Sequence, residues 1–187
     1  MHFAPGSGEL LDDVQVPVII VEAEKSDLAL RSFAQRIDRS MLLIAPGGCW
    51  AWKRKTGNRL LPDGGTEPET GPSPDFDLVK WQDRQVVILA DSNIASNRAV
   101  QKARRELAKE LTGRGAQVFF VDIPVEDQVN GPDDYLGRHS DADMTRLLES
   151  AKPFNQKPRE PQKADDQPQE TQPDHTTDTG NAEYFTA

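Results

Sequence analysis

Acidic residues follow three of the apolar runs in this sequence. They are Glu22 and Glu24, Asp91, and the pair Asp133 and Asp134. Short β-branched runs that end in carboxylates are typical of buried parallel strands, whose carboxyl ends open onto a ligand crevice. Carboxylates gathered there repel one another unless a cation lies between them, and hard oxygen ligands suit Mg²⁺ or Mn²⁺. The sequence therefore predicts a divalent-metal site for phosphate chemistry.

Each acidic cluster also has a purely structural interpretation. Glu22 is predicted at a strand end that faces a helix N-terminus, where an acid also complements the helix dipole. Asp91 and Asn93, two apart on an extended segment, are expected to point the same way and share a cation, or else to cap the next helix. Asp133 and Asp134 are predicted metal ligands, but adjacent acids after Asn-Gly-Pro are equally typical of a turn and a helix start.

A second group of residues combines aromatic rings with positive charge. Trp50 and Trp52 are followed directly by Lys53, Arg54 and Lys55. Indoles beside cations form a plausible platform for stacking bases and holding phosphates of single-stranded nucleic acid. The alternative is that the tryptophans, as large apolar groups, pin a loop onto the core.

The elements that must position these residues alternate along the chain. Apolar runs predict strands at 17–21, 41–45, 85–90 and 117–123, and helical spacing predicts helices at 26–37, 97–111 and 142–151. Ser140, with Asp143 three residues on, predicts a capping box for the last helix. The alternation predicts an α/β fold with a Rossmann-like, mostly parallel four-stranded sheet flanked by helices. Basic residues of the second helix are expected to form a solvated face: Lys102, Arg104, Arg105 and Lys109.

Composition divides the chain into three parts. Residues 1–15 are expected to be irregular, and residues 16–154 to form the folded domain. A long irregular insertion rich in Gly and Pro is predicted at about 47–80. Residues 155–187 are rich in Gln, Pro, Asp, Glu, Lys and Thr and have almost no aliphatic side chains, so a disordered acidic and polar tail is predicted there.

Composition also excludes several classes of protein. The chain has 187 residues, a net charge of −9, one cysteine and three scattered histidines. It therefore lacks the residues for an internal disulfide framework or a cysteine-rich zinc site. No apolar run approaches the roughly 20 residues that span a bilayer, and no signal peptide is recognisable. A cytoplasmic location without a membrane partner is expected. The acidic whole-chain charge argues against a generally basic nucleic-acid-binding surface, although it is a weak argument against local contact.

In order and spacing, the acidic clusters resemble those of the Toprim domain shared by DnaG-type primases, topoisomerases and related nucleases. Glu22 matches the glutamate after the first strand of that family, and Asp91 matches the first aspartate of its Asp-x-Asp pair. Gly-Pro-Asp-Asp-Tyr-Leu at 131–136 matches a further stretch found in primases. The segments 22–25, 48–52 and 133–136 also resemble a Toprim-like domain of unknown function from plasmid, phage and integrative-element replication proteins. The resemblance covers about 16–154.

The resemblance implies a Toprim-like fold that holds Mg²⁺ or Mn²⁺ and contacts single-stranded DNA or a nucleotide. It implies that Glu22 and Asp91 are catalytic, with Glu22 as general acid or base. It implies the metal ligands Glu22, Asp91, Asn93, Asp133 and Asp134, and the nucleic-acid contacts Trp50, Trp52, Lys53, Arg54, Lys55 and Lys25. The sequence departs from the pattern at Ala23, which replaces a glycine, and at Asn93, which replaces the second aspartate and removes one negative charge.

Two functional hypotheses follow. The first is a metal-binding domain of a mobile-element replication or primase-type protein, a nucleotidyltransferase or nuclease that acts on nucleic acid by metal-assisted phosphoryl or nucleotidyl transfer. The second is a catalytically degenerate Toprim fold that only binds a nucleotide, DNA or a replication partner such as a helicase or primase. A third expectation is that the chain is a truncated remnant of a longer replication protein.

Overall fold

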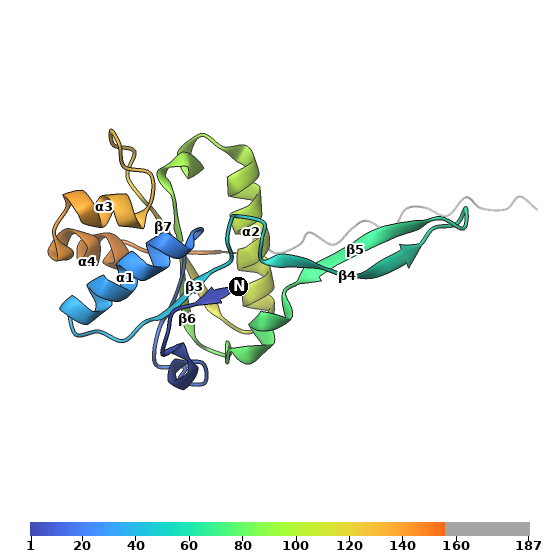
Figure 1. The fold of residues 1–187 in the computed structure, drawn as a ribbon, viewed down its shortest axis with the longest axis horizontal. Coiled ribbons are helices and arrows are strands. Elements are labelled where there is room, and N and C mark those ends of the chain that lie inside the picture. The colour runs from blue at the N-terminus through green and yellow to red at the C-terminus, as the bar shows by residue number, and fades with distance from the viewer. Residues whose placement is uncertain (156–187) are drawn as a thin grey trace, which may run out of the picture. The chain divides into compact units, whose positions relative to one another are not determined.

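A six-stranded sheet forms the centre of residues 1–155, which are the residues that the computed structural model describes (Figure 1). Its strands lie in the order β1-β3-β2-β6-β7-β8; the four inner strands are parallel, and β1 and β8 are antiparallel to their neighbours. The bounds are β1 His2–Phe3, β2 Val18–Ile20, β3 Leu42–Ala45, β6 Gln85–Ala90, β7 Gln117–Asp122 and β8 Lys152–Pro153. The four inner strands are those predicted from the sequence. The prediction of a four-stranded sheet was wrong, because the short strands β1 and β8 add an edge on each side.

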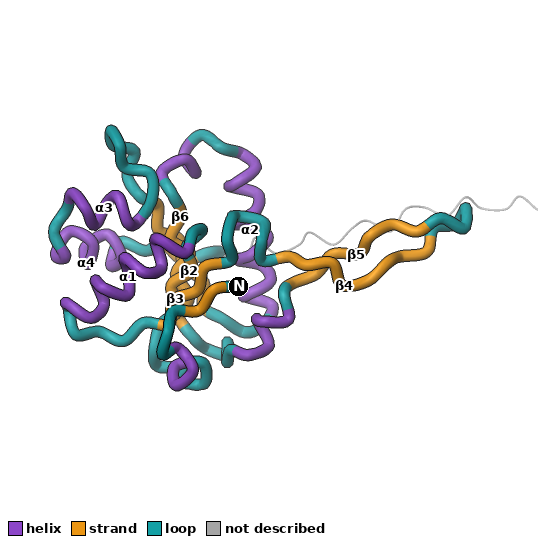
Figure 2. Tube along the Cα trace, in the orientation of Figure 1, coloured by secondary structure: helices purple, strands orange, loops and turns teal. Residues whose placement is uncertain are grey.

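Helices cover both faces of the sheet (Figure 2). Their bounds are α1 Glu24–Arg36, α2 Arg98–Gly113, α3 Pro132–Arg138 and α4 Asp141–Glu149. Leu107 and Leu111 of α2 pack on one face, whereas Phe33 of α1 and Met144 of α4 pack on the other. No helix in residues 1–155 is long and apolar enough to cross a membrane.

Burial on two faces explains why the inner strands are continuously apolar. Val18 and Ile20 of β2 face the α2 layer, and Ile19 between them faces the opposite layer. Because successive side chains of a strand point to opposite faces, a strand covered on both sides needs apolar residues at every position. This is the pattern that made these strands recognisable in the sequence.

The insertion expected to be irregular contains a β-hairpin. Strands β4 (Lys53–Leu60) and β5 (Thr66–Pro72) pair antiparallel with each other and with no other strand of the described chain. The hairpin extends away from the sheet beside α2 (Figure 1). Most of its side chains are exposed, so it lacks the one-sided apolar alternation that identifies a strand from sequence. The prediction of an irregular segment was therefore wrong over these two strands.

The amino-terminal residues are also ordered, contrary to expectation. Besides β1, they form a 3₁₀ helix at Ser7–Leu10. The guanidinium of Arg84, a residue with 0% exposure, donates hydrogen bonds to the carbonyl oxygens of Leu10, Leu11 and Val16 at 2.7, 2.9 and 2.8 Å. One buried side chain therefore ties this segment to the start of β6.

The helices agree with the sequence except near the end of the domain. The expected helix over 142–151 is observed as α4, and its capping box is confirmed: the backbone N–H of Asp143 donates to Ser140 Oγ, and that of Ser140 to Asp143 Oδ2. A further helix, α3, precedes it and begins at the Pro132-Asp133-Asp134 segment. The predicted disordered tail lies outside the described residues, apart from its first residue.

Candidate functional site

Glu22 lies just beyond the carboxyl end of β2, at the centre of the sheet. Its backbone carbonyl accepts hydrogen bonds from the N–H groups of Gly47 and Gly48, at 3.1 and 2.9 Å. Both glycines have φ in the left-handed region, at 91° and 132°, which favours residues without a Cβ. The loop after β3 therefore folds over Glu22 and holds its backbone in place. The sequence of this loop, Pro-Gly-Gly directly after the strand, is typical of a turn.

Asp91 follows β6, the parallel strand next to β2. Its Oδ2 accepts a hydrogen bond from the side-chain amide of Asn130 at 3.0 Å, and the next residue, Ser92, donates its backbone N–H to the carbonyl of Asn130 at 2.8 Å. The second carboxylate oxygen, Oδ1, is buried and has no hydrogen-bond partner within residues 1–155. A buried acceptor without a partner costs free energy, so this atom is a candidate ligand for a cation.

The charge of Asp91 acts on Glu22, and the charge of Asp133 acts on Asp91. Burial and the negative charge of Asp91 raise the pKa of Glu22 above its usual range. Burial, and next the charge of Asp133, raise the pKa of Asp91, although the ammonium of Lys25 opposes the shift. Carboxyl groups that share a partly buried site destabilise each other's charged form. The adjacent ends of β2 and β6 thus bring two of the predicted carboxylates together.

Asp133, in the first turn of α3, belongs to the same group but is already neutralised. Lys25 Nζ lies 2.9 Å from its Oδ2, and Ser26 Oγ donates a hydrogen bond of 2.7 Å to its Oδ1. Burial alone would raise the pKa of Asp133, but these hydrogen bonds outweigh burial and leave the pKa below its usual range. In this structure Lys25 supplies a counter-charge to the acidic group, and its predicted contact with nucleic acid stays a prediction. Ser26 was not singled out as a site residue from the sequence.

Gly131 lies in the middle of this group. A Cβ at this position would lie 3.0 Å from Asp133 Oδ1, 3.1 Å from Asp91 Oδ1 and 3.3 Å from Ser26 Oγ. Three oxygen atoms from three separate segments therefore approach one point, which a larger residue would fill. Asn130 was interpreted from the sequence only as a turn residue. Gly131 was interpreted as a turn residue and as the first residue of the stretch that resembles primases, but neither was predicted to line the carboxylates.

Two of the predicted ligands lie outside the group. Asn93 was expected to point the same way as Asp91 on an extended segment, but Ser92–Ala95 form a 3₁₀ helix and Asn93 is exposed. The two-residue alternation of a strand does not apply to a helical turn, so that expectation was wrong. Asp134 turns back toward its own helix start, where its Oδ2 accepts from the backbone N–H groups of Asn130 and Gly131 at 3.0 and 3.3 Å.

Glu22 and Asp91 remain as possible ligands of a divalent cation, and two carboxylates are fewer than a complete protein metal site needs. Within residues 1–155, no three side chains of His, Cys, Asp or Glu are grouped closely enough to hold a metal ion. The unpartnered Asp91 oxygen and the raised pKa values of Glu22 and Asp91 favour a cation beside these two residues. Mg²⁺ is commonly bound by one or two carboxylates together with water and substrate phosphates, and two carboxylates satisfy that requirement.

The tryptophan segment differs from the expected stacking platform. Trp52 is only 3% exposed and packs edge-on against Phe76, with ring centroids 6.4 Å apart. Its indole is therefore part of the core, as the structural alternative for this segment predicted. Trp50 is 36% exposed, and Lys53 Nζ lies 5.0 Å from its ring centroid and 4.8 Å from that of Trp52. Arg54 and Lys55 are exposed at the base of the hairpin.

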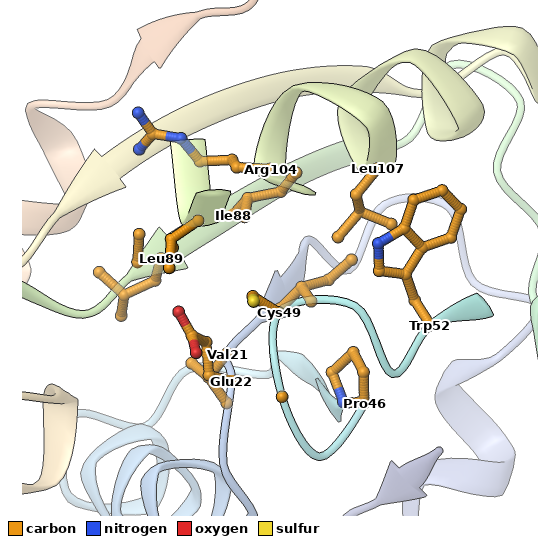
Figure 3. Close-up of a pocket in the computed structure, with 13 residues that line it drawn as sticks. Val21, Glu22, Pro46, Cys49, Trp52, Ile88, Leu89, Arg104 and Leu107 are labelled. Atoms are coloured by element: carbon orange, nitrogen blue, oxygen red, sulfur yellow. The ribbon is translucent and has the colours of Figure 1, made fainter. Parts of the chain in front are cut away.

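A small apolar cavity separates Glu22 from Trp52. Figure 3 shows the Glu22 carboxylate, the Cys49 sulfur and the Trp52 indole arranged around it, with Leu107 of α2 along one side. Its volume is about 30 Å³, which accommodates water-sized groups but not a nucleobase. Trp52 Nε1 is buried in its wall without a hydrogen-bond partner in residues 1–155.

Comparisons with known proteins give one family match. A family model described as a domain of unknown function, DUF3854, matches residues 8–143, more than two thirds of the chain. No curated protein matches the sequence. Among solved structures, the crystal structure of the Aquifex aeolicus primase, comprising zinc-binding and RNA polymerase domains, matches with 18% sequence identity and a TM-score of 0.41. The match covers 79% of this chain but only 28% of that chain.

Proposed function

The chain belongs to the DUF3854 family of domains of unknown function, and we propose that residues 16–154 form a Toprim-like module of a replication or primase-type protein. In this proposal the module binds a divalent cation together with a phosphate group of a nucleic acid or nucleotide. Glu22 and Asp91 are the protein ligands, and the phosphate and water complete the coordination.

The observation that carries the proposal is the pairing of Glu22 and Asp91 at the carboxyl ends of two adjacent parallel strands. Ligands of open α/β sheets bind outside this edge. Burial raises the pKa of both carboxyl groups, the charge of Asp91 adds to the shift of Glu22, and one buried oxygen of Asp91 has no partner within residues 1–155. A cation beside them would remove both penalties at once.

When bound, the cation would supply charge neutralisation at the phosphate and at the oxygens that attack or leave. Without the cation, burial and Asp91 raise the pKa of Glu22, so its carboxyl group holds a proton more readily than usual. Binding of the cation would release that proton and keep Glu22 ionised as a ligand. Lys25, whose ammonium contacts Asp133 from an exposed side chain, would be free to turn toward the phosphate when the local negative charge is compensated.

A second candidate function is binding of nucleic acid or a nucleotide without catalysis. It is favoured by the positions of Asn93 and Asp134: both lie outside the carboxylate group, which therefore lacks two of the five predicted ligands. In this case the site would bind Mg²⁺ weakly and transfer no phosphoryl or nucleotidyl group.

Titration with Mn²⁺ by calorimetry tests the first proposal, with and without a single-stranded oligonucleotide. We expect weak binding of the ion by the protein alone and tighter binding when the oligonucleotide supplies phosphates. Glu22→Gln and Asp91→Asn should each abolish the heat of binding.

Glu24→Gln is the matched control, since it removes one charge two residues away. Its side chain is 66% exposed and lies against His2, outside the carboxylate group. The metal-site proposal fails if no heat is observed at millimolar Mn²⁺ in either condition, or if Glu24→Gln reduces binding as much as Glu22→Gln. Metal binding without turnover of any oligonucleotide or nucleotide would favour the binding module.

A further inference from the structure

Helix α2 carries a row of four basic side chains on its outer surface. Arg98, Lys102, Arg105 and Lys109 are spaced four, three and four residues apart, so they lie on one side of the helix. All four are exposed, and together with Gln101 and Glu106 they line a shallow surface hollow. The opposite side of α2 is apolar and packs on the sheet. We call these four residues the α2 basic row.

The row is largely unneutralised by the rest of the domain. Arg98, Lys102 and Arg105 form no ion pair within residues 1–155, and Lys109 has one contact of 3.8 Å, to Glu106. Like charges three and four residues apart on a helix repel each other and destabilise it. This concentration of positive charge occurs in a chain whose net charge is −9. General solubility therefore does not explain it.

The row continues onto the base of the hairpin. Lys109 lines a second hollow together with Lys53 of β4 and with Gly71 and Pro72 of β5, and Glu106 and Glu110 of α2 line it as well. The exposed Arg54 and Lys55 follow Lys53 along the strand. At its other end the row begins at Arg98, seven residues after Asp91. The row on α2 and the basic residues at the hairpin base therefore border the same hollow.

We propose that the α2 basic row, with the hairpin base, binds the phosphodiester backbone of a nucleic acid. A linear series of exposed cations suits a linear polyanion, and it supplies the sequence-independent part of nucleic-acid binding. The row holds no aromatic residue, so it would contact phosphates and not bases. The inference rests on the proposed function for the substrate class, but binding by the row does not require a metal ion.

Oligonucleotide binding measured by fluorescence anisotropy in EDTA tests the inference on the full chain. Each phosphate contact contributes about 0.7 to the slope of log affinity against log salt for a single strand, and about 0.9 for a duplex. The double variant Lys102→Gln with Arg105→Gln should therefore lower the single-strand slope by about 1.4. Glutamine is a good helix former, so the helix itself is retained.

The matched control is the double variant Arg39→Gln with Lys80→Gln, which removes the same charge. Both residues are exposed and lie before the amino ends of strands β3 and β6, away from the row. We expect the control to keep the wild-type slope.

The inference is overturned if the two double variants behave alike, or if the wild type shows no salt-dependent binding. Equally tight binding of a polyglutamate of similar charge would also overturn it, because that result would assign the row to an acidic polypeptide. Loss of Mn²⁺ binding in the earlier titration, with oligonucleotide binding in EDTA intact, would reject the metal site and leave the row supported.

Discussion

Replacement of Arg84 by methionine should be among the most destabilising single substitutions in the domain. The guanidinium donates three hydrogen bonds of 2.7–2.9 Å to backbone carbonyls and a fourth, of 3.4 Å, to that of Lys80. Hydrogen bonds that involve a charged group contribute about 1.5–3 kcal/mol each, so the three short ones amount to about 4.5–9 kcal/mol. Burial of the charge offsets several kcal/mol of this, as the lowered pKa of Arg84 reflects. The expected net loss is about 3–5 kcal/mol.

Urea unfolding followed by circular dichroism measures this loss. With a slope of about 2 kcal/mol per molar urea, the midpoint should fall by about 2 M. The unfolding midpoint of Arg84→Lys should lie between those of Arg84→Met and the wild type, because one ammonium reaches fewer of the carbonyls. The exposed Arg39→Met is the control and should stay within about 0.5 kcal/mol of wild type. If Arg84→Met unfolds at the same urea concentration as this control, Arg84 does not clamp the amino-terminal segment.

Two further predictions concern single sites. Gly131→Ala should weaken Mn²⁺ binding by about 10–100-fold, since its Cβ would displace the neighbouring carboxylate oxygens by a few tenths of an ångström. The control is Gly137→Ala, within the helix that follows Gly131: its Cβ meets no atom within 4 Å, so this variant should bind Mn²⁺ as the wild type does. Equal Mn²⁺ titrations of the two variants would contradict the crowding. Asp27, at 0% exposure, has a pKa raised by burial despite its contact with His2. A raised folded pKa stabilises the fold below the ordinary value of 3.8, and this stabilisation is lost as the pH rises above that value. Asp27→Asn should therefore gain stability relative to wild type as the pH rises above 3.8, measured by urea unfolding, and a difference that stays constant with pH would contradict this.

The inner sheet and its main helices were predictable because their signals are local. Strand β6 was predicted at its observed bounds, 85–90, since both of its faces are buried and every position is apolar except its first. The end of helix α2 was predicted to within two residues. The start of α4 was predicted from Ser140 and Asp143, which form its capping box. Such patterns need no knowledge of distant residues.

The edge strands and the hairpin were not predictable, because they depend on pairing between residues distant in sequence. Strand β1 has two residues and exists because it pairs with β3, about 40 residues away. The hairpin consists of polar, Gly- and Pro-containing sequence with low strand propensity, so only mutual pairing identifies it. An isolated two-stranded hairpin has only marginal stability in water. The buried Trp52 at the base of this hairpin therefore supplies an apolar anchor to the domain.

For the site, the sequence alone determined which residue types could bind a cation and which strand ends would present them. Glu22 and Asp91 do meet at adjacent strand ends, because parallel strands place their carboxyl ends at one edge of the sheet. Only the tertiary structure decided how the other three candidates lie relative to this pair. Lys25 and Ser26 neutralise Asp133, Asp134 binds its own helix start, and a 3₁₀ turn carries Asn93 away. Side-chain direction depends on backbone dihedrals and on partners distant in sequence, which residue spacing does not contain.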